Sequence, residues 1–462
     1  MSQFGSHDAV DLINEIAERL TESAPAGWQQ LDVSFAMTGV CESALLIADN
    51  GERRVRYKVP DTVWDLVRRH RQASALASDG PWWRLVVHVD AAGARVVCDR
   101  GEEPFPGEQL FAPDAYRADL EAFPRERLPV WLAAYVGRGE SMSRSPRQAA
   151  EHARADRAAG VWPVLVTREL LDLNELWARW AVLSAAFVAV GSTWGPRMCP
   201  SAGVFEGAGR SGSTLALLPG GRAVLSGGVW NAPALEAAYN TGAVMPKFFA
   251  GAPYWVSDAV LNTRVATGLL SFCYWWEAGQ WYRGESAPMT ECASAMPAVW
   301  TVGSMVSILA DLCAAAPESS ELLVAAAQAG GVTRGHIRSV FGDGDEIDCD
   351  AAFYQFVIAG LAVADGGVLS ETDAIALVRE HIRRGGSDTT GFSLSALTAD
   401  RLGAGWVVQS PVGDGEFALD RAVFYVADDG VVEQSTESVP ASEYTAGFEQ
   451  RFWLRRDSRS DR

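Results

Sequence analysis

Paired apolar runs joined across glycine turns are the feature that most constrains the fold of this 462-residue chain. One pair flanks Asn50-Gly51, a second turns at Ala91-Ala92-Gly93, and a third turns at Pro219-Gly220-Gly221. Because glycine and asparagine tolerate the positive φ of tight hairpin turns, each pair predicts two antiparallel strands. Runs with a helical apolar period lie before, between and after the first two pairs. We therefore expect an α+β fold of small antiparallel sheets with flanking helices.

The chain is longer than most single hydrophobic cores, so several domains are expected. Residues 1–136 are predicted to form an α+β domain in the order αββαββα, and 137–160 a polar linker that runs into an exposed helix. A Gly- and Trp-rich region over 161–385 is predicted to be mixed and mainly helical. A second α+β domain is expected over 386–455, and a charged, disordered tail over 456–462.

The net charge of −19 limits the partners of the protein. It argues against a non-specific nucleic-acid binder and against docking on an anionic membrane, because both surfaces are themselves negatively charged. An acidic surface speeds the encounter with a basic protein. Keeping an abundant protein dispersed explains the same charge equally well.

The seven cysteines are scattered singly, without a CxxC pair, so neither a disulfide framework nor a zinc site is expected. The N-terminal stretch has no basic region followed by an apolar run, so no signal peptide is predicted. The longest apolar runs are too short, or too charged, to span a bilayer. We expect a cytoplasmic protein.

A glycine-rich stretch over 203–214 suggests a phosphate-binding loop, because Gly207, Gly209 and Gly212 satisfy G-x-G-x-x-G. A P-loop requires lysine after its last glycine, and this position holds Ser213. Both phosphate motifs also require a following helix, whereas the residues that follow predict a hairpin. A glycine-rich bend is therefore favoured over a nucleotide site.

The densest aromatic stretch, "SFCYWWEAGQWYRGE", covers residues 271–285. It fits a packed core, a protein contact or a small-molecule pocket, and a core is favoured for part of it. Trp275 and Trp276 are expected to be mostly buried, whereas Trp281 and Tyr282 are expected to be exposed and to contact a partner. The rival hypothesis is a nucleotide- or small-molecule-binding enzyme that uses this stretch together with the 203–214 loop.

No constellation of catalytic residues is visible elsewhere. The acidic stretch 343–351 fails the calcium-loop pattern, since Ile347 stands where Asp or Asn is needed and Asp348 where Gly is needed. The six histidines include no pair at metal-ligand spacing, and no G-x-S-x-G nucleophile motif occurs. We predict no catalytic residue, no cofactor and no metal.

The N-terminal region resembles the YezG-like immunity (antitoxin) family of bacterial polymorphic toxin systems. The resemblance is carried by "AGWQQLDVSF", "NGERRVRYKVP", "GPWWRLVVHVDAAGARVVCDRGEEPF" and "LFAPDAYRADLEAFPRERLPVWL". Its Trp-led strand, D-x-x-G turn and closing Pro-Arg and Pro-x-Trp elements match in order at Trp28, Asp90–Gly93, Pro124-Arg125 and Pro129–Trp131.

The C-terminal region resembles the YrhB-type immunity domain. The matching residues are the "GWVV" strand at 405–408, the run "AVFYVADDGVVEQS" and the closing "SEYTAGFEQRF". The middle of the chain resembles no family.

These resemblances imply binding rather than turnover. Immunity proteins of these kinds bind a cognate toxin and block it, and a cationic nuclease or NAD-cleaving toxin would be attracted to an acidic partner. Trp281, Tyr282, Asp428, Asp429 and Glu433 are the candidate contacts, with further rim charges in the acidic loop 343–350. A binding module that has no toxin as its partner is a further alternative.

Overall fold

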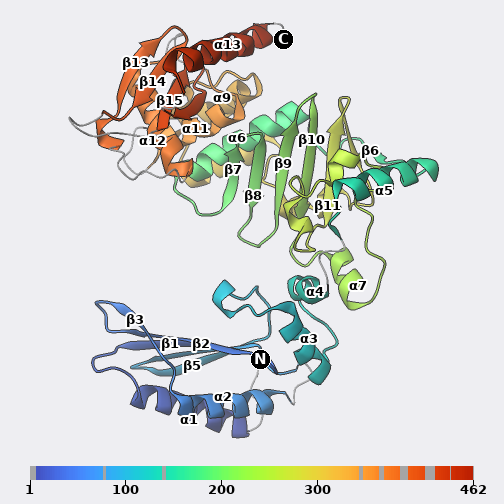
Figure 1. The fold of residues 1–462 in the computed structure, drawn as a ribbon, viewed down its shortest axis with the longest axis vertical. Helices are drawn as coiled ribbons and strands as arrows, with labels where there is room; N and C mark the ends of the chain where they lie inside the picture. The colour runs from blue at the N-terminus through green and yellow to red at the C-terminus, as the bar shows by residue number, and fades with distance from the viewer. Residues whose placement is uncertain are drawn as a thin grey trace. The chain divides into compact units, whose positions relative to one another are not determined.

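The computed structural model describes residues 7–75, 80–137, 142–342, 347–363, 369–385, 394–411, 422–436 and 439–460 (Figure 1). These residues form helices and three antiparallel sheets, so the predicted α+β class is confirmed. The chain divides into two compact units. The first comprises Met1–Ser143, Asn231–Pro246 and Arg264–Leu269, and the second comprises Arg144–Trp230, Lys247–Thr263 and Leu270–Arg462. The domain boundaries derived from the sequence stay a prediction.

The first unit is built on a five-stranded sheet in the order β3-β2-β1-β4-β5. Its strands are β1 (Gln30–Met37), β2 (Glu42–Asp49), β3 (Arg54–Tyr57), β4 (Arg84–Asp90) and β5 (Gly93–Asp99). Helices α1 (His7–Glu22) and α2 (Asp61–Ser74) lie side by side on one face (Figure 1). The unit also contains η1 (Gly107–Gln109), α3 (Pro113–Ala122), α4 (Val130–Gly137) and α7 (Pro233–Asn240).

The predicted order of this unit is wrong by one strand, because three strands rather than two precede α2. The Asn50-Gly51 turn lies within the second apolar run and divides it into β2 and β3, which pair through Asp49 and Arg54. Gly51 has a φ of 84°, as the turn chemistry predicts. Alternation along β1 places Leu31, Val33 and Phe35 in the core beneath the two helices.

A buried carboxylate, Asp119 of α3, ties four segments of the first unit together. Its two oxygens accept hydrogen bonds from Arg71 of α2 at 2.7 and 2.8 Å. They also accept the indole N–H of Trp83 at 2.8 Å and the backbone N–H of Gly39 at 2.8 Å. Asp119 is fully buried and Arg71 almost so. The charge is thus compensated by an opposite charge and by further donors, as a buried ion requires.

Burial of His70 makes the stability of the first unit depend on pH. The ring stacks against Trp82, whose indole N–H donates to Nδ1 at 3.1 Å, and burial lowers the pKa of His70 from 6.5 to about 4. The unfolded chain therefore binds the proton more readily, and protonation favours unfolding. We expect about 3 kcal/mol of stability to be lost as the pH falls from 6.5 to 4.

This loss is measured by urea unfolding of the first unit across that pH range. His70→Gln should flatten the pH dependence, whereas His152→Gln, on an exposed surface of the second unit, should leave it unchanged. An equally steep dependence in His70→Gln would contradict the assignment.

The second unit is built on a seven-stranded sheet in the order β6-β12-β11-β10-β9-β8-β7. Its strands are β6 (Val164–Val166), β7 (Gly195–Cys199), β8 (Ala202–Glu206), β9 (Gly212–Leu218), β10 (Arg222–Gly228), β11 (Phe272–Glu277) and β12 (Gln280–Arg283). The sequence pattern predicted only the β9–β10 hairpin of this sheet.

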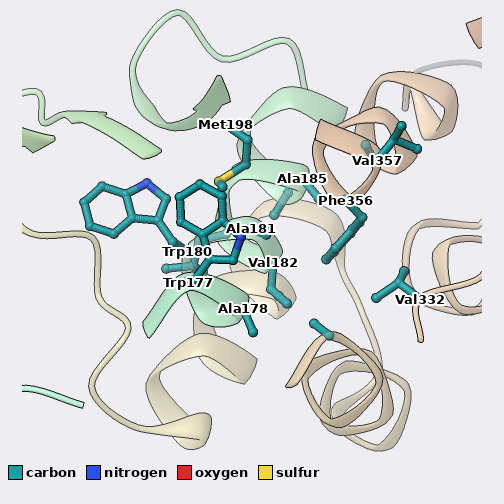
Figure 2. Close-up of a cluster of buried hydrophobic side chains, with 14 of the residues drawn as sticks. Trp177, Ala178, Trp180, Ala181, Val182, Ala185, Met198, Val332, Phe356 and Val357 are labelled. Carbon is teal, nitrogen blue, oxygen red and sulfur yellow. The ribbon is translucent and has the colours of Figure 1, made fainter. Parts of the chain in front are cut away.

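Helix α6 (Leu173–Ala189) packs against one face of this sheet and is almost wholly buried. Figure 2 shows side chains of α6, Trp177, Trp180 and Ala185 among them, in one buried cluster with Met198 of β7 and Phe356 of α11. The other helices are α5 (Pro146–Ala158), α8 (Val302–Cys313), α9 (Pro317–Gln328), α10 (Arg334–Phe341), α11 (Cys349–Ala359) and α12 (Glu371–Gly385). Short 3-10 turns are η3 (Tyr254–Ser257), η4 (Thr263–Val265), η5 (Met289–Glu291), η6 (Ala293–Ala295) and η7 (Leu394–Ala396).

The C-terminal sheet has the order β13-β14-β15-β16. Its elements are β13 (Thr398–Leu402), β14 (Gly405–Gln409), β15 (Ala422–Ala427), β16 (Val432–Thr436) and α13 (Ala441–Ser460). Phe424 and Val426 belong to the same core as α6, whereas Tyr425 packs beneath Phe448 of α13. Because α13 extends to Ser460, residues 456–460 are helical rather than part of a disordered tail, and 461–462 lie outside the described residues.

Among the helices of the described ranges, none combines the length and the apolar character needed to cross a bilayer.

Candidate functional site: an exposed apolar edge strand

The aromatic stretch forms the hairpin of β11 and β12, the third and second strands from one edge of the seven-stranded sheet. Glu277 pairs with Gln280, which leaves Ala278 and Gly279 as a two-residue turn. Their φ angles are 50° and 78°, and two successive positive φ values are typical of the type I′ hairpin turn. The stretch is therefore sheet, and its side chains alternate between the two faces.

Of the four aromatic residues whose burial was predicted, Trp275 alone behaves fully as expected. Trp275 is buried as expected, and Trp276 is half-buried. The predicted exposure of Trp281 is wrong: its side chain is 3% exposed, packs edge-to-face on Trp276, and donates its N–H to the Leu171 carbonyl at 2.8 Å. Tyr282 is half-buried and stacks on Trp275. The register of the hairpin places Trp281 on the face of the sheet that α6 covers. The residues next to Trp281 in the sequence do not reveal this placement.

The exposed apolar surface lies one strand further out, on β6 and the residues just before it. This strand pairs with β12 through Val166 and Trp281, Leu165 and Tyr282, and Val164 and Arg283, and it is the edge of the sheet. We call Val161, Trp162, Val164 and Leu165 the apolar edge. Their exposed fractions are 37%, 73%, 48% and 49%.

The geometry of the strand spreads this surface around the sheet edge. Successive side chains point to opposite faces, so Val164 and Leu165 expose apolar atoms on both. Within the described ranges, β12 is the only element that forms backbone hydrogen bonds with Val164–Val166. Single exposed apolar residues are ordinary on protein surfaces, but a contiguous run that includes a tryptophan is typical of a protein-binding site.

The backbone beneath the apolar edge is held firmly. The carbonyl of Asp156 accepts the N–H of Val161 at 2.8 Å, and the carboxylate of Asp156 accepts the N–H of Gly251 at 2.9 Å. A Cβ on Gly251 would lie 2.5 Å from Pro163 N and 2.7 Å from the Trp162 carbonyl carbon, so only glycine permits this approach. Pro163 directly precedes β6, and a proline beside a short apolar run indicates an edge strand. This signal could have revealed the site in the sequence.

The three acidic candidates all form ion pairs within the C-terminal sheet and its helix α13. Each pairs with an arginine: Asp428 with Arg401, Asp429 with Arg455, and Glu433 with Arg451. Asp428 is buried and also accepts the N–H of Leu369 at 3.0 Å. Their contact with a partner stays a prediction, but their charges are compensated inside the fold. In the acidic loop, residues 343–346 lie outside the described ranges, and Asp348 caps α11 by accepting the Ala351 N–H at 2.8 Å.

The glycine-rich stretch 203–214 joins two strands, β8 and β9, rather than a strand and a helix. Gly207 N–H donates to the Ser211 carbonyl at 2.9 Å and closes the bend. Gly203 lies against the indole of Trp180, where a Cβ would come within 2.9 Å of Nε1. Packing and turn geometry thus account for Gly203 and Gly207, and this loop presents no helix N-terminus to a phosphate.

Among the described residues, no three or more His, Cys, Asp or Glu side chains gather as a metal-binding group would. No protein-family model matches the chain, and no curated protein matches it either.

Proposed function

We propose that this chain is an immunity protein, which binds a bacterial toxin domain with one-to-one stoichiometry and blocks it in the cytoplasm. The observation that carries the proposal is the apolar edge: a tryptophan that is 73% exposed, with three neighbouring aliphatic side chains, on β6 and the residues just before it. Exposed apolar residues cost solubility, and a protein partner that covers them removes this cost. Tryptophan is also the residue type most enriched among dominant binding contacts.

The resemblance to two immunity families supports this function, and the structure gives the matching residues structural roles. Arg125 lies 3.5 Å above the ring of Trp83, and Trp131 donates its N–H to the Gly101 carbonyl at 2.7 Å. Trp406 donates to the Leu369 carbonyl at 2.7 Å. Since these residues stabilise the fold, the proposal places the partner contacts at other positions.

The net charge of the chain indicates which class of toxin it would bind. A net charge of −19 speeds the encounter with a basic domain, and nucleases and other enzymes that bind phosphorylated substrates present cationic surfaces. A nuclease or an NAD-cleaving domain is therefore the proposed partner. The stabilising contacts would be apolar, while the long-range attraction would be electrostatic.

Co-expression tests the proposal. We expect the gene for this chain to lie beside one that encodes a secreted protein with a toxic C-terminal domain. Expression of that domain alone should stop growth, and co-expression with this chain should restore it. Growth arrest that persists at equal expression of both proteins would refute the proposal.

A further inference from the structure

Two arginines bracket the apolar edge, and both are exposed. Arg157 precedes Val161 by four residues, and Arg168 follows Val166 by two. The segment 157–168 contains no acidic residue, although the chain as a whole carries a charge of −19. The segment that contains the apolar edge is therefore cationic.

The charges of these two arginines are not compensated by the described part of the chain, where neither of them forms an ion pair. Other exposed arginines do pair with carboxylates; examples are Arg54 with Asp32, Arg68 with Glu42 and Arg95 with Asp90. The two carboxylates closest in sequence to the apolar edge bind groups other than these arginines. Asp156 binds the N–H of Gly251, and Glu169 binds Arg283 at 3.7 Å and the N–H of Met289 at 3.1 Å.

Both arginines can reach a ligand that covers the apolar edge. Consecutive residues advance at most about 3.6 Å, so the Cα of Arg168 lies within about 11 Å of that of Leu165. By the same measure the Cα of Arg157 lies within about 14 Å of that of Val161. The long arginine side chain shortens both gaps. Arg168 also has a φ of 67°, an uncommon conformation for a residue with a side chain, directly where β6 ends.

We propose that the apolar edge binds a protein segment that carries apolar side chains at its centre and carboxylates at both ends. The apolar centre covers Trp162, Val164 and Leu165, and the carboxylates pair with Arg157 and Arg168. Charge complementarity selects this occupant, because a cationic segment would be repelled at both ends. The identity of the partner is the one part of this inference that rests on the proposed function. If the partner is the toxin, the segment belongs to a part of the toxin outside its cationic substrate site.

Fluorescein-labelled peptides test this inference on the full-length chain, with binding measured by fluorescence anisotropy. The probe peptide has the sequence Glu-Val-Thr-Val-Thr-Val-Glu, and its counterpart replaces both glutamates with lysine. The probe should bind at least about tenfold more tightly than the lysine peptide. Trp162→Ser should weaken the binding of the probe at least about tenfold, because the central anchor is lost.

Charge reversal supplies the decisive variant. Arg157→Glu/Arg168→Glu should reverse the preference, so that the lysine peptide binds more tightly. Arg53→Glu/Arg338→Glu, which changes two other exposed arginines, should retain the preference of the wild-type chain. Failure of the probe to bind, equal binding of the two peptides, or an unchanged preference after charge reversal would overturn the inference. The assay contains no toxin, so its outcome is independent of co-expression rescue.

Discussion

Replacing Asp119 with alanine is expected to lower the free energy of unfolding of the first unit by about 3–5 kcal/mol. Among the described residues, Asp119 is the only carboxylate that pairs with the buried guanidinium of Arg71, and the substitution removes it. It also leaves the N–H groups of Trp83 and Gly39 without their acceptor. Removing the partner of a buried cation lowers the free energy of unfolding by more than the lost attraction, because the cation remains buried without a charge that offsets its desolvation. Urea unfolding followed by far-UV circular dichroism measures the change.

Asp114→Ala supplies the matched control on the same helix. Asp114 pairs with Arg117, but both side chains are exposed, so this pair should contribute less than about 1 kcal/mol. Equal losses for the two alanine variants would show that burial of the Asp119 network does not stabilise the first unit.

Trp281→Ala and Trp162→Ser are expected to have opposite consequences. Removal of the Trp281 ring leaves a void beneath α6 and an unused Leu171 carbonyl, which should cost about 3–5 kcal/mol. Trp162 is mostly exposed, so Trp162→Ser should change stability by no more than about 0.5 kcal/mol while it removes the central binding contact.

Thermal unfolding of the second unit distinguishes the two roles. The unfolding temperature should fall by several degrees in Trp281→Ala and stay within about one degree of wild type in Trp162→Ser. Comparable shifts in the two variants would contradict the assignment of Trp281 to the core and of Trp162 to the surface.

Local chemistry explains which parts of the fold the sequence could predict. The Asn50-Gly51 and Pro219-Gly220-Gly221 turns were found because their residues adopt backbone conformations that other residues avoid. The seven-stranded sheet was missed because its outer strands lack a clear signal. β6 has three residues, β7 contains Pro196, and β6 pairs with β12 more than one hundred residues away. Pairing over such a separation is not encoded in any short window of sequence.

The same limit applied to the candidate site. The aromatic stretch pairs with β6 through β12, but the exposed apolar residues lie on β6 and just before it rather than in the stretch itself. The acidic run "ADDG" makes Asp428 a candidate surface charge, whereas in the fold Asp428 is buried and pairs with Arg401, on a strand two positions away in the sheet. Burial depends on partners that are distant in the sequence, so composition and spacing alone did not reveal it.

Growth rescue by edge variants tests the central claim most directly. In cells that express the neighbouring toxin domain, the wild-type chain should restore growth, and so should Leu322→Ser, which changes an exposed leucine on α9. The double variant Trp162→Ser/Leu165→Ser, expressed to the same level, should fail to restore growth because the apolar edge has lost its anchors. Rescue by the double variant equal to that of the wild-type chain would contradict binding through this edge.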